Sequence, residues 1–282
     1  MVLICLCASV QAEPSLKHVG SLRWEQPEPW FGGWSGIEIT DNGSRMTVIS
    51  DRGQVTQTKL QRTNGRISGV GILSTKRLGK SAGEALNKKA GDAEGLAIAD
   101  NGNAFVSFEH RHRIMQTNLM TGRTSGRINL PFKDTMGENS GVEALAISAD
   151  GTLFAMVEQA QSGGAPFPLY AYKNGAWRVS AHIPRRGPFR PVGADFDTKG
   201  RLWLLERAVT PLGFRSRIRL FIIDPNAPSE HTLLTTIPAR YDNLEGISVW
   251  NAKDGQMHVT LISDDNFMHI LRTQIVEYTV AE

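Results

Sequence analysis

Acidic residues recur at two fixed places within a repeated sequence pattern. One set lies at the start of short apolar segments, and the other follows the next apolar segment of the same repeat. The first set is Glu94, Glu143, Asp195 and Glu245, and the second is Asp51, Glu109, Glu158, Glu206, Asp264 and Asp265. Calcium takes six to eight oxygen ligands and tolerates irregular geometry, so carboxylates contributed by several repeats suit it. These acids would repel one another strongly if they met without a counter-charge.

Two interpretations of these acids remain open. They either form ion pairs and backbone caps, or they bind hard cations. Basic residues that could pair with them stand beside several of the acids or further along the chain: Arg52, His110, Arg111, Arg207 and Arg272. A zinc site is not indicated, because His110 and His112 are separated by one residue and no third histidine is near.

The elements that would position the acids form a repeat of two short apolar strands joined by a turn. Asn-Gly or Asp-Gly occupies most of these turns, as is typical of β-hairpins. Small residues occur at matching places 59, 49, 50 and 52 residues apart, at Gly36, Gly95, Ala144, Ala194 and Gly246. Two more strands follow most hairpins. A period near 50 with four strands per unit predicts an all-β fold, a single β-propeller.

Direct counting gives five blades. Six remain possible if the 59-residue interval or the C-terminal tail contains another. After the fifth hairpin the chain is too short for a full blade, so residues 16–24 are expected to supply its outer strand and to join the two termini in one blade. In a propeller the innermost strand starts where the second strand ends. The acids are therefore expected around one channel mouth, with the Asn-Gly turns at the opposite face.

Composition and charge limit the class of protein that this sequence can form. The chain has 282 residues, 40% hydrophobic and 21% charged, which is typical of a globular protein. Its net charge of +3 comes from interleaved charges, so nucleic-acid binding is not favoured.

The N-terminus predicts export. The uncharged apolar start and Val10-Gln11-Ala12 predict a signal peptide over 1–12, cleaved after Ala12, and a periplasmic or secreted mature domain over 13–282. The apolar start is too short to span a bilayer, so the mature chain is expected to have no integral membrane segment.

Several motifs together resemble the phytase-like domain family, described by the phrase "esterase-like activity of phytase". They are Ser35-Gly36-Ile37, Ser50-Asp51-Arg52-Gly53, Asp92-Ala93-Glu94-Gly95-Leu96, Glu143-Ala144-Leu145-Ala146, Glu206-Arg207, Asp242-Asn243-Leu244-Glu245-Gly246 and Ser263-Asp264-Asp265-Asn266-Phe267. The resemblance runs from about Trp34 to Arg272 and implies an exported bacterial propeller and a phosphoester hydrolase. The calcium-dependent propeller phytases, distantly similar to this family, have six blades, whereas the direct count here is five.

The function expected on this basis is calcium-dependent hydrolysis of a small phosphorylated substrate at the mouth. The metal ligands would be Glu94, Glu143, Glu245, Asp51, Glu109 and Asp264, and the phosphate would be bound by Arg52, Arg111, Arg207 and Arg272. The sequence singles out no general base. Two alternatives are a non-catalytic propeller that binds a ligand or protein and uses calcium only for stability, and a sugar-lactone hydrolase with one metal in the channel.

Overall fold

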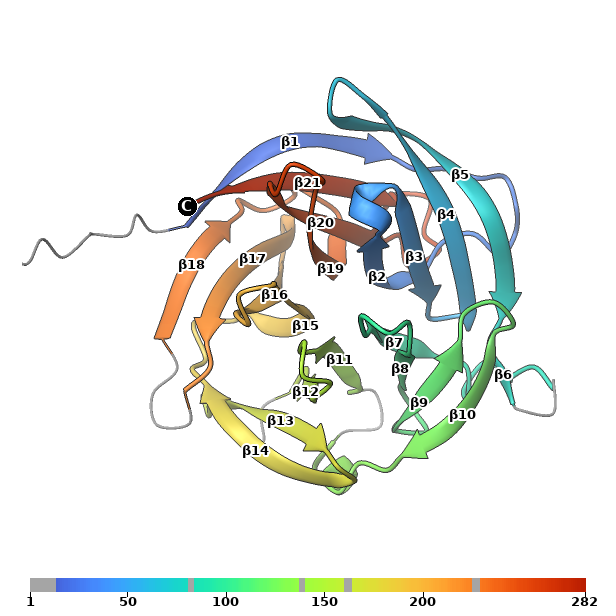
Figure 1. Cartoon of the computed structure of the whole chain (residues 1–282), viewed down its shortest axis with the longest axis vertical. Helices are drawn as coiled ribbons and strands as arrows, with labels where there is room; N and C mark the ends of the chain where they lie inside the picture. Colours follow the sequence, from blue (N-terminus) through green and yellow to red (C-terminus); the bar gives the residue numbers. More distant parts are fainter. Residues whose placement is uncertain (1–13, 81–83, 137–139, 160–163, 225–228) are drawn as a thin grey trace, which may run out of the picture.

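Five separate sheets, antiparallel except for one short added strand, surround one axis in the computed structural model (Figure 1). The structure describes residues 14–80, 84–136, 140–159, 164–224 and 229–282. The innermost strands contact one another in a closed cycle, β2 to β7, β11, β15, β19 and back to β2. The chain is therefore a five-bladed β-propeller, and the six-blade alternative does not hold. In the described residues the only helical elements are two 3-10 turns, Asp41–Gly43 and Lys133–Thr135.

Each blade runs outward from its innermost strand. Blade 1 contains β2 (Trp34–Thr40), β3 (Arg45–Ser50), β4 (Gln54–Thr63) and β5 (Arg66–Arg77). Blade 2 contains β7 (Ala93–Ile98), β8 (Ala104–Phe108), β9 (Arg113–Asn118) and β10 (Arg123–Ile128), with the short β6 (Gly79–Lys80) added in parallel to β10. Blade 3 contains β11 (Val142–Ile147), β12 (Leu153–Val157), β13 (Phe167–Lys173) and β14 (Ala176–Ile183). Blade 4 contains β15 (Arg190–Phe196), β16 (Leu202–Thr210), β17 (Gly213–Ile222) and β18 (Ser229–Thr235).

Blade 5 is built from both ends of the chain. It contains β19 (Asn243–Asn251), β20 (Met257–Asp264) and β21 (Gln274–Ala281), and its outer strand is β1 (Ser15–Arg23). Ser15 lies opposite Ala281 and Arg23 lies opposite Gln274 in an antiparallel pair (Figure 1). The predicted joining of the termini in one blade is confirmed, and the pairing covers an edge of β21 that would otherwise be open.

Small residues recur on the innermost strands because neighbouring blades touch there. A Cβ added to Gly95 would lie 2.7 Å from Leu145 Cβ, and one added to Gly246 would lie 2.9 Å from a methyl carbon of Ile37. A Cβ on Gly193 would lie 2.5 Å from a backbone oxygen of the next blade. We call these sites, with Gly36 and Ala144, the anchor positions. The anchor predicted at Ala194 is therefore wrong by one residue and lies at Gly193. A bulge between Pro191 and Gly193 matches the bulge before the anchor in the other blades.

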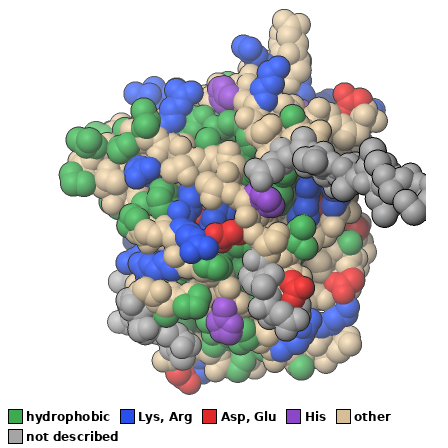
Figure 2. Space-filling model, turned by 90° about the vertical axis from the view of Figure 1, so that its left-hand side faces the viewer, with side chains coloured by type: hydrophobic (Ala, Val, Ile, Leu, Met, Phe, Trp, Pro, Cys, Tyr) green, Lys and Arg blue, Asp and Glu red, His purple; other side chains and the backbone are tan. Residues whose placement is uncertain are grey.

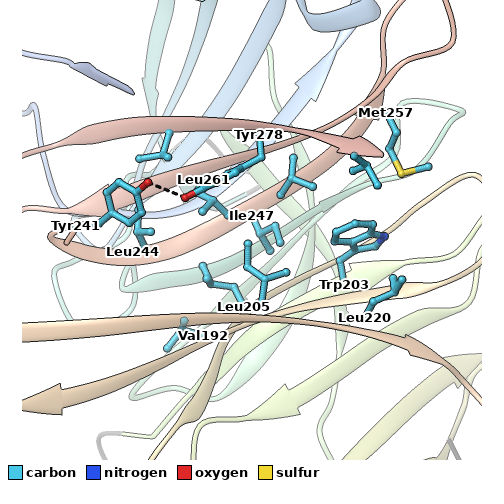
Figure 3. Close-up of a cluster of buried hydrophobic side chains, with 14 residues drawn as sticks. Val192, Trp203, Leu205, Leu220, Tyr241, Leu244, Ile247, Met257, Leu261 and Tyr278 are labelled. Carbon is cyan, nitrogen blue, oxygen red and sulfur yellow. Dashed lines mark hydrogen bonds between the residues drawn. The ribbon is translucent and has the colours of Figure 1, made fainter. Parts of the chain in front are cut away.

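The apolar core lies between adjacent blades. Between blades 4 and 5, Trp203, Leu205 and Leu220 face Ile247, Leu261 and other side chains of the next sheet (Figure 3). The hydroxyls of Tyr241 and Tyr278 are 2.6 Å apart at one side of this cluster, so each buried phenol has a hydrogen-bonding partner. This packing fixes where the innermost strands begin, and with them the channel mouth.

On the side of the molecule in Figure 2, lysine and arginine side chains are scattered among apolar, acidic and uncharged ones. Among the described residues, no helix is long and apolar enough to cross a membrane. The predicted signal peptide over 1–12 and the cleavage position after Ala12 lie outside the described residues.

Candidate metal centre at the channel mouth

The mouth is the end of the channel where innermost strands begin and second strands end. The residue just before each anchor lies in the bulge at this end of the innermost strand. In blade order these residues are Ser35, Glu94, Glu143, Val192 and Glu245. Three of the five are glutamates, in blades 2, 3 and 5. Both Glu143 and Glu245 are only 8% exposed, so the local geometry removes them from most of the solvent.

The second strands bring another ring of residues to the mouth. In blade 1, Trp34 lies opposite Ser50, and the next residue, Asp51, reaches the mouth. The same register places Glu109, Glu158, Arg207 and Asp264 in the other four blades. Four of these five positions are acidic and the fifth is arginine. The structure therefore brings all six predicted metal-binding residues to one mouth.

Glu206 does not belong to this ring. It lies one residue before the mouth position, and a shift of one residue turns a strand side chain to the other face of the sheet. Its carboxylate accepts hydrogen bonds from Arg217 Nε at 2.6 Å and from Arg219 Nη2 at 2.6 Å. Arg219 also donates to Glu230 at 2.8 Å, and Glu230 in turn accepts from Arg186. We call these five residues the blade-4 arginine network. Glu206 therefore has a pairing role within blade 4.

Asp195 also lies away from the predicted mouth set. It is two residues past the anchor Gly193, as Glu38 is two residues past Gly36, so both are further along the channel. Asp195 accepts backbone hydrogen bonds from Phe196 at 2.7 Å and Val249 at 2.6 Å. Glu38 accepts from the backbone of Ile98 at 3.2 Å. These carboxyls join neighbouring innermost strands, as the ion-pairing and capping interpretation expects.

Carboxylate oxygens crowd at the mouth. Glu94, Glu109 and Glu143 each offer an oxygen, and these oxygens lie within 4.8 Å of one another. Burial and then the neighbouring Glu143 and Glu245 raise the pKa of Glu94 well above its usual range. Burial and then Glu245 and Glu158 do the same to the pKa of Glu143. The crowding therefore favours the protonated form of these carboxyls unless a cation offsets their negative charge.

The two aspartates at the ends of second strands show the same effect. Burial, with the nearby charge of Asp92, raises the pKa of Asp51 to about 7. Burial, with the charge of Glu245, raises the pKa of Asp264 to about 9. Asp51 Oδ1 is buried and has no hydrogen-bond partner among the described residues. A buried carboxylate oxygen without a donor is unfavourable unless a proton or cation reaches it.

Arg207 is the cation in the two rings of mouth residues. Its guanidinium donates to Asn243 Oδ1 at 2.7 Å, to Glu158 Oε1 at 3.1 Å and to Glu245. Burial alone would lower the pKa of Arg207, but the charges of Glu245, Glu158 and Glu143 outweigh burial and raise it. Asn243 also donates to Glu245 at 2.7 Å. One side of the mouth is thus internally neutralised by Arg207, while the side of Glu94, Glu109 and Asp51 is not.

Asp92 and His110 extend the open side of the mouth. His110 Nε2 lies 3.1 Å from Asp92 Oδ2 and 3.6 Å from Glu109 Oε2. Asp92, Glu109 and His110 form a second group whose possible ligand atoms lie within 4.8 Å of one another. The prediction from the sequence left both residues out of the metal set. The signal was available, because Asp92 immediately precedes the innermost strand and His110 immediately follows Glu109.

The four arginines predicted to bind phosphate are not brought together. Arg207 is in the mouth and already has three acceptors. Arg52 is exposed beside Asp51, with its guanidinium carbon 3.0 Å from the ring centroid of Phe267. Arg111 lines a cavity on the outer part of blade 2. Arg272 lines a different cavity beside the loop that follows β20. Arg52 is thus the predicted arginine that combines a rim position with exposure.

Beneath the mouth the channel is almost filled. A cavity of about 10 Å³ remains between the innermost strands, lined by anchor glycines, Glu143, Glu245 and apolar side chains. This is at the lower limit of the space that a single water needs. Any ligand of these acids must therefore approach from the mouth side.

The donor set fits calcium. The cation binds oxygen at 2.3–2.6 Å, so ligands on opposite sides of it are about 4.6–5.2 Å apart. The oxygens of Glu94, Glu109 and Glu143 meet that requirement at 4.8 Å or less. The unpartnered Asp51 Oδ1 supplies a further oxygen that lacks a donor. A carboxylate-rich set with irregular geometry suits calcium better than a metal that demands a strict octahedron.

A model of the phytase-like family, described as "Esterase-like activity of phytase", matches residues 29–267. The match covers most of the chain and includes all the mouth residues named above. The chain belongs to this family. A comparison with curated proteins found no match.

Among solved structures, the chain is similar to the PQQ-bound aldose sugar dehydrogenase of Streptomyces coelicolor, with 12% identity and a TM-score of 0.54. That alignment covers 96% of this chain and 99% of the dehydrogenase. A gluconolactonase of Xanthomonas campestris is 17% identical with a TM-score of 0.44, over 87% of this chain and 72% of that one. At these identities the likeness to the dehydrogenase concerns the fold alone, and the weaker likeness to the gluconolactonase carries no argument.

Proposed function

We propose that this protein is a calcium-dependent phosphoester hydrolase that acts on a small phosphorylated substrate at the channel mouth. The observation that carries the proposal is the group of oxygens from Glu94, Glu109 and Glu143 within 4.8 Å of one another, beside the unpartnered Asp51 Oδ1. Membership of the phytase-like family supports the same class of reaction. The family supports a hydrolase, and the calcium and the phosphoester are the steps that this proposal adds.

Glu94, Glu109, Glu143 and Asp51 would hold the metal, with Asp264 and Glu245 completing the set. When bound, calcium would neutralise phosphate oxygens and make water a better nucleophile. Glu245 is oriented by Arg207 and Asn243, and Asp264 Oδ1 accepts the backbone hydrogen of Asn266 at 2.7 Å. These contacts hold the carboxylates in place, so less conformational freedom remains to be lost when a ligand binds.

Arg52 is the side chain best placed to bind the substrate's phosphate. Its guanidinium rests on the Phe267 ring and is exposed at the rim, so its donors can reach a ligand from solvent. Arginine suits this role because its planar donors match phosphate oxygens. Arg207 plays a different part, since its donors are occupied by carboxylates and the Asn243 side chain.

The test combines metal binding and catalysis in one variant. In Glu94→Gln/Glu143→Gln we expect the calcium-dependent rise in melting temperature to disappear and calcium-dependent phosphomonoesterase activity to fall with it. A ligand stabilises the folded state by RT ln(1 + [L]/Kd), so melting reports on binding directly. Asp100→Asn, in the turn at the opposite face, is the matched control and should keep both properties.

Each negative outcome has a distinct meaning. A wild-type melting temperature that ignores millimolar calcium removes the metal from the proposal, since that is about the affinity limit of weak extracellular calcium sites. Calcium binding without hydrolysis of any phosphomonoester favours the binding propeller with structural calcium. Hydrolysis of sugar lactones with one bound metal would favour the lactonase.

A further inference from the structure

The outer part of blade 2 contains a cavity of about 510 Å³ that is separate from the acidic mouth. Its floor comes from β9 and β10, and one wall comes from residues 84–90, which follow β6. Leu86 donates a backbone hydrogen bond to Leu78, and Gly79 pairs with Ala85, so this wall is tied to the blade. A cavity of this size matches those that bind small molecules in proteins, about 300–1,000 Å³.

The charges lining this cavity are strongly unbalanced. Four cations line it, Lys80, Arg111, Arg113 and Arg127, against one described carboxylate, Glu84. That carboxylate is engaged by Lys80, whose Nζ lies 2.7 Å from Glu84 Oε2. Among the described residues, no carboxylate lies within ion-pair distance of the three arginines. The cavity therefore has three positive charges that no described carboxylate neutralises.

Arg113 is a buried arginine that has no acidic partner among the described residues. It is 6% exposed, and its guanidinium donates to two backbone carbonyls, Arg111 O at 2.8 Å and Ala90 O at 2.6 Å. Its guanidinium carbon also lies 4.2 Å from the ring centroid of Phe108. These contacts fix its position without neutralising it. Burial, and then the charges of Arg127 and Arg111, lower the pKa of Arg113 to about 10.

A buried cation is normally paired with an anion, because burying a charge alone is costly. Arg113 therefore favours an anionic ligand in this cavity.

A bulge in β10 also shapes the cavity, since the register of β10 against β9 shifts between Ser125 and Ile128. Bulges of this kind redirect side chains near binding sites. Here the bulge contains Gly126 and Arg127, both of which line the cavity.

We propose that this cavity binds a small molecule through an oxyanion group, a phosphate or a carboxylate, held by Arg111, Arg113 and Arg127. Arginine donors match either group, and Leu86, Ala90 and Met115 give the cavity an apolar side for the rest of the ligand. The inference does not depend on the proposed hydrolase activity, since it uses none of the mouth carboxylates. The two sites are nonetheless close along the chain, because the turn after β8 carries Glu109 at the mouth and Arg111 at the cavity.

The test is a calorimetric titration of the whole protein with inorganic phosphate in metal-free buffer. Sodium chloride at the same ionic strength is the reference for general salt effects. We expect saturable binding of one phosphate, and at least about a tenfold loss of affinity in Arg127→Gln, because charge-assisted hydrogen bonds are the stronger ones. Arg178→Gln is the matched control, since Arg178 is an exposed arginine on β14 in blade 3.

Arg111→Gln provides a second variant with the same expected loss, should the first fold poorly. A parallel titration with citrate separates the two sources of the oxyanion: tighter phosphate binding indicates a phosphorylated ligand, and tighter citrate binding indicates a carboxylate ligand. The proposal is overturned if neither anion binds saturably. It is equally overturned if Arg127→Gln and Arg111→Gln, both folded, bind as tightly as Arg178→Gln.

Discussion

Glu206 and Arg207 are neighbours in the chain, but they lie in regions with opposite charge balance. Glu206 belongs to the blade-4 arginine network, where arginine donors surround a carboxylate that is 0% exposed. Arg207 belongs to the mouth, where three neighbouring glutamates raise its pKa despite burial. In the network every described charge has a partner within the protein. At the mouth the acids outnumber the cations, so protons or an external cation must balance their charge. The acids of the network are therefore structural, whereas the acids on the open side of the mouth are available to a ligand.

The largest expected effect is on the network. Glu206→Gln leaves Arg217 and Arg219 with a neutral partner in the interior, where Arg219 is 0% exposed. Breaking a buried pair in this way destabilises a protein by about 3–5 kcal/mol. Urea denaturation should show this loss equally with and without calcium. A loss that calcium reverses would show that Glu206 communicates with the mouth, and the comparison would fail.

The next effect concerns the mouth itself. Arg207→Met removes the cation that holds Glu158 and Glu245, so the calcium-free protein should lose about 2–3 kcal/mol of unfolding free energy, as when a charged hydrogen-bonding partner is removed. Added calcium should restore much of this loss, because it supplies the missing positive charge. Thermal melting with and without calcium measures the recovery. Absence of any recovery would argue against a cation site among these acids.

The pH dependence of calcium binding should also distinguish the mouth from the blade-4 arginine network. Asp51 and Asp264 have folded pKa values of about 7 and about 9, above the ordinary value for aspartate. Raised carboxyl pKa values favour the folded state at low pH, and this contribution is lost as pH rises through 7 and then 9. Calcium must displace these protons, so its affinity should rise by up to about tenfold per pH unit for each proton released.

This dependence can be measured by calcium titrations between pH 6 and 9 in buffers of different ionisation enthalpy, which count the released protons. A calcium affinity that is flat over this range, with no proton release, would contradict the raised pKa values at the mouth. The Glu206→Gln variant should keep the wild-type profile, because its altered side chain faces the other side of the sheet.

The smallest effect is expected at an exposed pair. Lys80 and Glu84 lie 2.7 Å apart, with side chains 58% and 68% exposed. Glu84→Gln should change the free energy of unfolding by no more than about 0.5 kcal/mol, since exposed ion pairs contribute little. Urea denaturation at low and high salt checks this. A loss comparable to that in Glu206→Gln would mean that burial does not separate these classes of pair.

Much of the fold was predictable because the repeat is visible in the sequence. The hairpins near Gly36, Gly95 and Gly246 predicted the number and positions of the blades, and the short C-terminal tail indicated that β1 must complete blade 5. Blade 4 was misaligned by one residue, because Gly193 and Ala194 are both small and the bulge that selects between them leaves no distinct sequence signal. The grouping of Asp195 with Glu94 was a separate misalignment, because Asp195 follows the predicted anchor Ala194 whereas Glu94 precedes Gly95.

The mouth was predictable in its residues but less so in its pairing. All six predicted ligands reach it, because their positions follow from the alternation of strands. Glu206 was assigned to it wrongly, since a one-residue shift reverses the side of the sheet. Its partner Arg217 lies directly opposite on β17, a relation that only the strand register reveals. The four arginines predicted to bind phosphate do not meet, because each lies on a different loop or strand end. At such positions the sequence does not predict where a side chain points.

The pairing of β1 with β21 has a consequence for the order in which the molecule is made. Ser15 is among the first described residues to be synthesised, and its partner Ala281 is among the last. Blades 1 to 4 are complete in sequence before the last three strands of blade 5 begin, and two of these strands, β19 and β20, contain Glu245 and Asp264. All the acids of the mouth can therefore meet only once blade 5 has joined the ring. Their mutual repulsion arises in full only in the closed ring, where the contacts between all five blades oppose it.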